Sequence, residues 1–201
     1  GGLVSLNGQW YIFYHRDTNN NWYARQACVE PVEIEIKGNK IKIDEVPSTS
    51  MGFNRQGLNP YKKYPAAIAC HFSGGVYAQA TYDPAVKCNP LVNVVNNSVI
   101  GYRDYNFDAL TGENNQLQLD IVPQGVEGTI DVMLDHPTEA DGGTKLGTIQ
   151  IPANAKPVLR THSMTIQGAD KIKGKHALYL TCQSKENKGI CDIYYLRFVR
   201  K

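Results

Sequence analysis

Two pairs of aspartates stand at a spacing that could bring carboxylates together for chemistry. Asp131 and Asp135, like Asp104 and Asp108, lie four positions apart, so each pair shares a face if its strand is regular. Two such carboxylates could work as a general acid and a general base. Paired acids are equally at home on a solvated sheet face, and we predict no catalytic residue among them.

Histidines and cysteines could bind a metal ion, and the cysteines could also form disulfides. The histidines that follow Cys70 show no metal-ligand spacing with one another or with cysteine, so we predict no transition-metal site. Five cysteines leave at least one thiol free, which argues against a disulfide-built scaffold. Cys182 and Cys191 flank the polar stretch QSKENKGI and could either meet across a hairpin or remain separate thiols.

The elements that must position these residues are strands. Short alternating or β-branched segments such as QLQLDIV, TIDVML, ALYLTC and CDIYYLRFV are separated by turn residues, and helix signals are almost absent. The pattern predicts an all-β chain. EIEIKGNKIKID is two alternating strands about a turn at Gly38 and Asn39, which predicts a β-hairpin.

The chain is divided by a change in this alternation. Residues 1–43 contain strands such as WYIFYH, whose two faces are both apolar or aromatic and both need cover. Residues 44–75 have the Pro, Gly and Ser content of a linker. Residues 76–201 hold regularly spaced strands that suit one β-sandwich or jelly roll.

Charge and hydropathy exclude some partners. The net charge of +2 over 201 residues gives no field that would attract nucleic acid. No apolar run approaches the ~18 residues that a membrane-spanning helix needs. We therefore expect neither a nucleic acid nor a membrane as partner.

Several motifs resemble a known group of enzymes. NGQWYIFYHRDTNN and RQACVEPVEI resemble the last blade of the five-bladed propeller in family 43 glycoside hydrolases, and KYPAAIACHF resembles the linker after it. IGYRDYNF, GTIDVMLDHP, KHALYLTC and DIYYLRF resemble a family 6 carbohydrate-binding module, which is a β-sandwich. The resemblance implies an all-β chain in which a jelly-roll sandwich follows a fragment of a propeller blade.

The resemblance also sets an expectation about catalysis. Family 43 enzymes invert the anomeric centre with a general acid and a general base that stand roughly 6.5–9.5 Å apart. The resemblance places these carboxylates on earlier blades, so we expect the chain to carry none of them and to be the C-terminal part of a longer β-xylosidase or α-L-arabinofuranosidase.

A sugar site is implied by the same resemblance. It places Tyr102 at the first stacking aromatic and Asp192 at an asparagine that orients sugar hydroxyls. Pro157 stands where the family has a second stacking ring, a tryptophan, and Tyr105 or Phe107 could compensate. We therefore predict carbohydrate binding by Tyr102, Tyr105 and Asp192.

The family's structural calcium is doubtful in this chain. In the same alignment its two carboxylate ligands correspond to Gln79 and Tyr194, which are poor replacements for charged oxygen ligands. No other cofactor is implied.

Three functional hypotheses follow. The chain could be a carbohydrate-binding accessory region that holds a glycosidase on xylan or arabinoxylan, with cell-wall polysaccharide and the catalytic propeller as partners and an extracellular location. It could instead be a purely structural module that packs on the propeller, or part of an active glycosidase. The apolar faces of residues 1–43 further predict that the chain dimerises or belongs to a larger protein.

Overall fold

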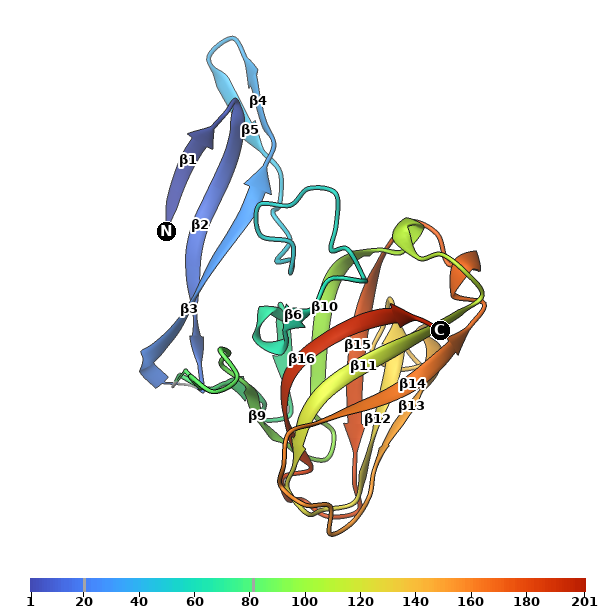
Figure 1. The fold of residues 1–201 in the computed structure, drawn as a ribbon. Helices are drawn as coiled ribbons and strands as arrows, with labels where there is room; N and C mark the ends of the chain where they lie inside the picture. The colour runs from blue at the N-terminus through green and yellow to red at the C-terminus, as the bar shows by residue number, and fades with distance from the viewer. Residues whose placement is uncertain (20, 81) are drawn as a thin grey trace.

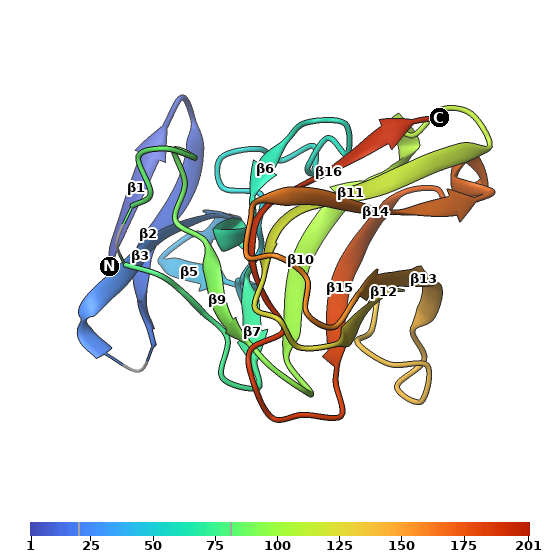
Figure 2. The same cartoon turned by 60° about the horizontal axis from the view of Figure 1, so that its bottom comes forward.

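The computed structural model describes residues 1–19, 21–80 and 82–201, and it is all-β as predicted (Figure 1). A β-sandwich forms the larger part, and two small sheets from the N-terminal segment stand beside it (Figures 1 and 2). No helix among these residues is long and apolar enough to cross a membrane.

The sandwich consists of two antiparallel sheets that face each other. The first has the order β13-β12-β15-β10-β7. Its strands are β7 (His71–Ser73), β10 (Val99–Asn106), β12 (Gly128–Leu134), β13 (Thr144–Ile151) and β15 (Lys175–Gln183). The second has the order β14-β11-β16-β9-β8, with β6 added beside β16. Its strands are β6 (Tyr64–Pro65), β8 (Tyr77–Ala78), β9 (Leu91–Val94), β11 (Asn114–Pro123), β14 (Arg160–Gln167) and β16 (Cys191–Arg200).

The core between the sheets follows from strict alternation along the strands. In β11, Leu117, Leu119 and Ile121 are fully buried, while the residues between them point outward and are polar. Tyr105 packs edge-on against Phe198 with 5.7 Å between ring centroids, and Phe107 meets Phe198 at the same distance. This aromatic cluster is part of one continuous apolar core.

The N-terminal segment forms two small sheets. One is three-stranded, in the order β1 (Gly2–Leu6), β2 (Gln9–Thr18), β3 (Asn21–Val32), and we call it the N-terminal sheet. The other is the hairpin β4 (Ile34–Lys37) and β5 (Lys40–Ile43), which confirms the hairpin predicted from the sequence. In this hairpin Ile36 pairs with Ile41 and Glu35 pairs with Lys42, so one face is all isoleucine and the other is all charged.

The segment 44–75, predicted to be a linker, joins the sandwich from its middle onward. Leu58, Ala66 and Ala69 are part of the buried core, and β6 and β7 pair with β16 and β10. A short 3-10 helix, η1 (Ala66–Ile68), lies between them. The connector is therefore shorter than the sequence suggested, because its strands, of two and three residues, are too brief to show a period. Two more 3-10 turns, η2 (Phe107–Ala109) and η3 (Ala169–Lys171), lie within the sandwich.

Candidate functional site

A polar cleft lies where several loops meet at one end of the sandwich, the lower end in Figure 1. We call it the loop-end cleft; its volume is about 470 Å³. The residues that line it are Asn96, Asn97, Glu127, Gly128, Thr129, Gln183, Ser184, Lys185 and Glu186. The volume falls within the range of about 300–1,000 Å³ that is typical of small-molecule sites.

Hydrogen bonds between the loops fix the shape of this cleft. Ser184 donates its backbone N–H to the side-chain oxygen of Asn96 at 3.0 Å and its hydroxyl to the carbonyl of Glu127 at 2.7 Å. The backbone N–H of Asn97 donates to the carbonyl of Cys182 at 2.9 Å. Three loops from both sheets are thereby cross-linked around Ser184, which makes the cleft largely preformed.

The lining of the cleft suits hydroxyl-rich ligands. Carboxylates of Glu127 and Glu186, the amide of Gln183 and the ammonium of Lys185 offer both donors and acceptors. None of the described residues that line the cleft is aromatic. A sugar bound here would be held by hydrogen bonds without a ring to stack on, and such sites bind weakly.

The two tyrosines predicted to stack on sugar lie elsewhere. Tyr102 and Tyr105 are 0% exposed and belong to the core between the sheets. Tyr102 donates its hydroxyl to the carbonyl of Ala66 at 3.0 Å, and burial raises its pKa well above the usual value. Neither ring has a face that a ligand can reach, so the structure contradicts this prediction. Phe107, which could have compensated for the missing tryptophan, is buried in the same way.

Asp192 is the predicted site residue that does lie at the loop end. It is half-buried near the start of β16, and it accepts a hydrogen bond from the side-chain amide of Gln124 at 2.8 Å. Burial raises the pKa of its carboxyl, and the Gln124 hydrogen bond opposes that shift. Asp192 does not line the loop-end cleft, so the structure places it at the same end of the sandwich but not in that cavity.

The remaining predicted positions add no stacking ring, metal site or disulfide. Pro157 lies in the exposed loop between β13 and β14, followed by exposed Val158 and Leu159. Gln79, one of the two positions matched to calcium ligands, donates its backbone N–H to the carbonyl of Pro90. No three His, Cys, Asp or Glu side chains among the described residues gather to hold a metal ion.

All five cysteines are free thiols. Cys182 and Cys191 are fully buried, so of the two alternatives for this pair the structure shows separate thiols. Burial raises the pKa of the Cys182 thiol to about 12. These two thiols therefore behave as small core residues.

The chain is similar in sequence and in structure to known glycoside hydrolases. No protein-family model matches the chain. A xylosidase/arabinosidase of Thermoclostridium stercorarium is 42% identical over 84 residues, which are 40% of this chain and 17% of that protein. A family 43 arabinoxylan arabinofuranohydrolase of Bacillus subtilis, solved with cellotetraose, superposes with a TM-score of 0.65 and 18% identity over 99% of this chain and 40% of that one.

The chain resembles the C-terminal part of a family 43 glycoside hydrolase. A family 6 carbohydrate-binding module of Clostridium cellulolyticum, solved with xylose, matches 71% of this chain and 100% of its own length, with a TM-score of 0.57 and 18% identity. The sandwich thus has the fold of family 6 modules, as the motifs predicted. The chain spans less than half of the two larger proteins.

The lining residues of the cleft were missed by sequence reasoning. Their signal is present in the polar stretches VNNS, which follows β9, and QSKENKGI, which follows the predicted strand ALYLTC. Polar loops are common at strand ends, and only the folded chain shows that these two meet at Ser184.

Proposed function

We propose that this chain is the C-terminal accessory region of a glycoside hydrolase that acts on xylan or arabinoxylan, and that its sandwich binds the polysaccharide at the loop end. The loop-end cleft carries this proposal, because it is a preformed polar cavity on a sandwich with the fold of carbohydrate-binding modules. The parent reaction would be hydrolysis of terminal xylosyl or arabinofuranosyl linkages. A polymeric cell-wall substrate implies an extracellular location.

Binding at this cleft would raise the local substrate concentration rather than perform chemistry. A tethered module converts the second encounter with the polymer into an intramolecular one, so even a dissociation constant in the millimolar range is useful. Gln183 and Glu127 would hydrogen-bond sugar hydroxyls. Asp192, paired with Gln124, would contact a chain that extends beyond the cleft.

Calorimetric titration with xylo-oligosaccharides and arabinoxylo-oligosaccharides tests the proposal. We expect saturable binding that Gln183→Ala weakens about tenfold. Gln167→Ala is the matched control. Gln167 is also exposed, but it pairs with Asn114 at the start of β11, the end of that strand away from the cleft. The absence of heat with every glycan, from a chain shown to be folded, would reject carbohydrate binding.

A structural role is the second candidate, favoured by the lack of aromatic residues in the cleft and by the exposed isoleucine face of the hairpin. Ile36 and Ile41 are 67% and 69% exposed, and a two-stranded hairpin is marginally stable alone. In this role the face packs on the catalytic propeller. Ile36→Thr with Ile41→Thr would then weaken association with the separately produced propeller domain without changing glycan binding.

A further inference from the structure

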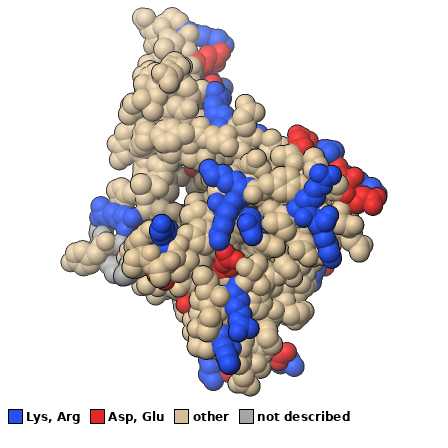
Figure 3. Space-filling model, in the orientation of Figure 1, with Lys and Arg blue, Asp and Glu red and all other residues tan. Residues whose placement is uncertain are grey.

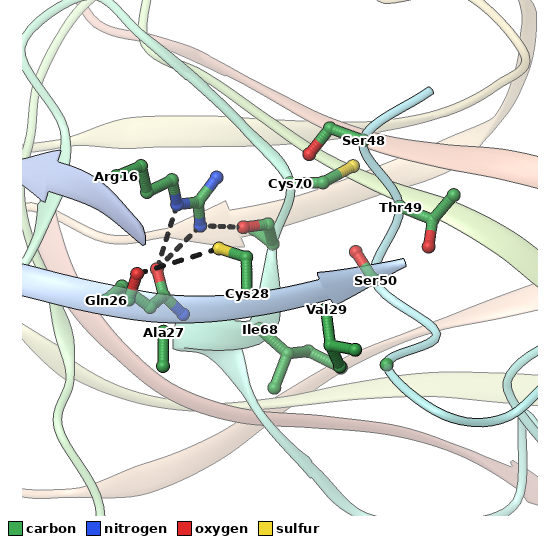
Figure 4. Close-up of a pocket in the computed structure, with 12 residues that line it drawn as sticks. Arg16, Gln26, Ala27, Cys28, Val29, Ser48, Thr49, Ser50, Ile68 and Cys70 are labelled. Carbon is green, nitrogen blue, oxygen red and sulfur yellow. Dashed lines mark hydrogen bonds between the residues drawn. The ribbon is translucent and has the colours of Figure 1, made fainter. Parts of the chain in front are cut away.

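A second cavity lies far from the loop end, between the N-terminal sheet and the connector. Its volume is about 150 Å³, and Figure 4 shows residues that line it. One wall comes from β2 and β3, with Arg16, Gln26 and Cys28, and the other from residues 48–52 and 68–70. We call it the hinge cavity, because its two walls come from the N-terminal sheet and from the connector. With about 30 Å³ per water molecule in the liquid, it has room for roughly five waters, or for one small solute.

Arg16 brings a positive charge into this cavity without a carboxylate to balance it. Its Nε and Nη2 donate to the side-chain oxygen of Gln26, and Nη2 also donates to the carbonyl of Ala69. The guanidinium carbon lies 4.4 Å from the ring centroid of Phe72. Within the described part of the chain, no Asp or Glu oxygen lies within ion-pair distance of Arg16, and its Nη1 makes no hydrogen bond.

The nearest buried carboxylate is already engaged. Glu30 is 2% exposed and accepts hydrogen bonds from the hydroxyl of Tyr14 at 3.1 Å and from the backbone N–H and hydroxyl of Thr49. Burial lowers the pKa of Arg16, because desolvation penalises the charged guanidinium. A half-buried cation with neutral partners alone is an incomplete arrangement.

The other unsatisfied group in the wall is also able to donate. Ser50 is 8% exposed, lines the hinge cavity, and has a hydroxyl with no hydrogen-bond partner among the described residues. The remaining polar groups are used: Gln26 donates its amide to the carbonyl of Ala67, Ser48 is bonded to Tyr14, and both thiols point to carbonyl oxygens. These side-chain groups of the wall are engaged, while Nη1 of Arg16 and the hydroxyl of Ser50 have no hydrogen-bond partner among the described residues.

We propose that the hinge cavity binds a small oxyanion, a carboxylate or a phosphate, between Arg16 and Ser50. The anion would balance the Arg16 charge and accept the hydrogen bond that Ser50 lacks. Because Arg16 and Ser50 belong to the N-terminal sheet and to the connector, a bound anion stabilises the contact between these two segments. This inference does not depend on carbohydrate binding at the loop end.

Thermal unfolding and calorimetry of the whole chain with sodium acetate or sodium phosphate test this inference. Sodium chloride keeps the ionic strength constant. We expect a saturable rise in Tm with at least one of the two anions. Arg16→Gln should weaken the affinity at least tenfold, and Ser50→Ala about tenfold, as for loss of a hydrogen bond to a charged group. Arg25→Gln is the control, since Arg25 is an exposed arginine on the same sheet.

The two anions separate the possible sources. A response to acetate alone assigns a carboxylate ligand, and a response to phosphate alone assigns a phosphate. The absence of a saturable response in the natural chain would overturn the proposal, as would an equal response in Arg16→Gln. If Arg16→Gln does not fold, Ser50→Ala decides, and an unchanged affinity in that variant overturns the proposal.

Discussion

The sandwich and the N-terminal sheet are built from the same kinds of strand but are stabilised in different ways. The sandwich buries leucines, isoleucines and aromatic rings between two sheets, with fully enclosed side chains such as Leu119 and Phe198. In the N-terminal sheet, all five residues of β1 are exposed, and polar groups such as Glu30 and Arg16 make the contacts that hold it. Two sheets that face each other enclose a hydrophobic core between them. A single sheet has no such core and is stabilised by hydrogen bonds and by the segments that pack against it.

The largest expected effect lies in the aromatic cluster of the sandwich. Phe198→Ala should lower the free energy of unfolding by about 3–5 kcal/mol, because it leaves a cavity against Tyr105 and Phe107. Phe53→Ala removes a ring that contacts Tyr11 at 5.3 Å in the N-terminal part but is 54% exposed, and should cost less than about 1 kcal/mol. Urea unfolding measures both, and equal costs would mean that the two parts share one core.

The buried carboxylate of the N-terminal sheet should give the next largest effect. Glu30→Ala leaves the hydroxyl of Tyr14 and the backbone N–H of Thr49 without their acceptor, and should cost about 1.5–3 kcal/mol. Hydrogen exchange should accelerate at Thr49 while the amides of β11 keep their protection. Glu33→Ala, at an exposed acid, is the control. Loss of protection in both parts would show that they unfold as one unit.

Two aspartates on the six-stranded sheet should respond to pH with opposite signs. Burial raises the pKa of Asp192. Burial also acts to raise the pKa of Asp120, but hydrogen bonds from Lys63 and Thr161, with the Lys63 and Arg197 charges, lower it overall from 3.8. The charged Asp192 carboxylate therefore lowers the free energy of unfolding at pH values above its raised pKa. This destabilisation is relieved as the pH falls through that pKa. Asp120 adds stability above its usual pKa, and the gain is lost as pH falls through the lowered value.

Asparagine substitutions at these two positions measure those signs. At pH 7, Asp192→Asn should raise Tm and Asp120→Asn should lower it, and both differences should shrink in acid. The Asp192 difference should shrink at the higher pH of the two. A Tm change of the same sign in both variants would contradict the opposite shifts.

The smallest effect is expected on the isoleucine face of the hairpin. Ile41→Val removes a methylene group from a side chain that is mostly in water, and should change the free energy of unfolding by less than about 0.5 kcal/mol. The matched change Ile149→Val, at a core residue 1% exposed, should cost about 0.5–1.5 kcal/mol. A larger cost at Ile41 would show that this face is covered in solution, for instance by a second copy of the chain.

The sequence by itself determined the strand content, the hairpin at Gly38 and the sandwich fold. The strand content and the hairpin are local: alternation with a period of two fixes which side chains face the core, and a glycine turn fixes a hairpin register. The sandwich was indicated by the regular spacing of strands along residues 76–201. The motif resemblance then supplied the architecture of the whole chain, and the solved structures confirmed it.

The sites were decided by tertiary structure alone. Tyr102 and Tyr105 are three positions apart and would face opposite sides of a regular strand. A register shift between them in β10 leaves both rings in the core, and the sequence pattern does not show that irregularity. The loop-end cleft and the hinge cavity are each built from segments that are distant in sequence, Asn96 with Ser184 in one and Arg16 with Ser50 in the other. Such contacts arise only when the sheets pack, because long-range pairing is fixed by burial of the whole core and leaves no local periodicity to detect.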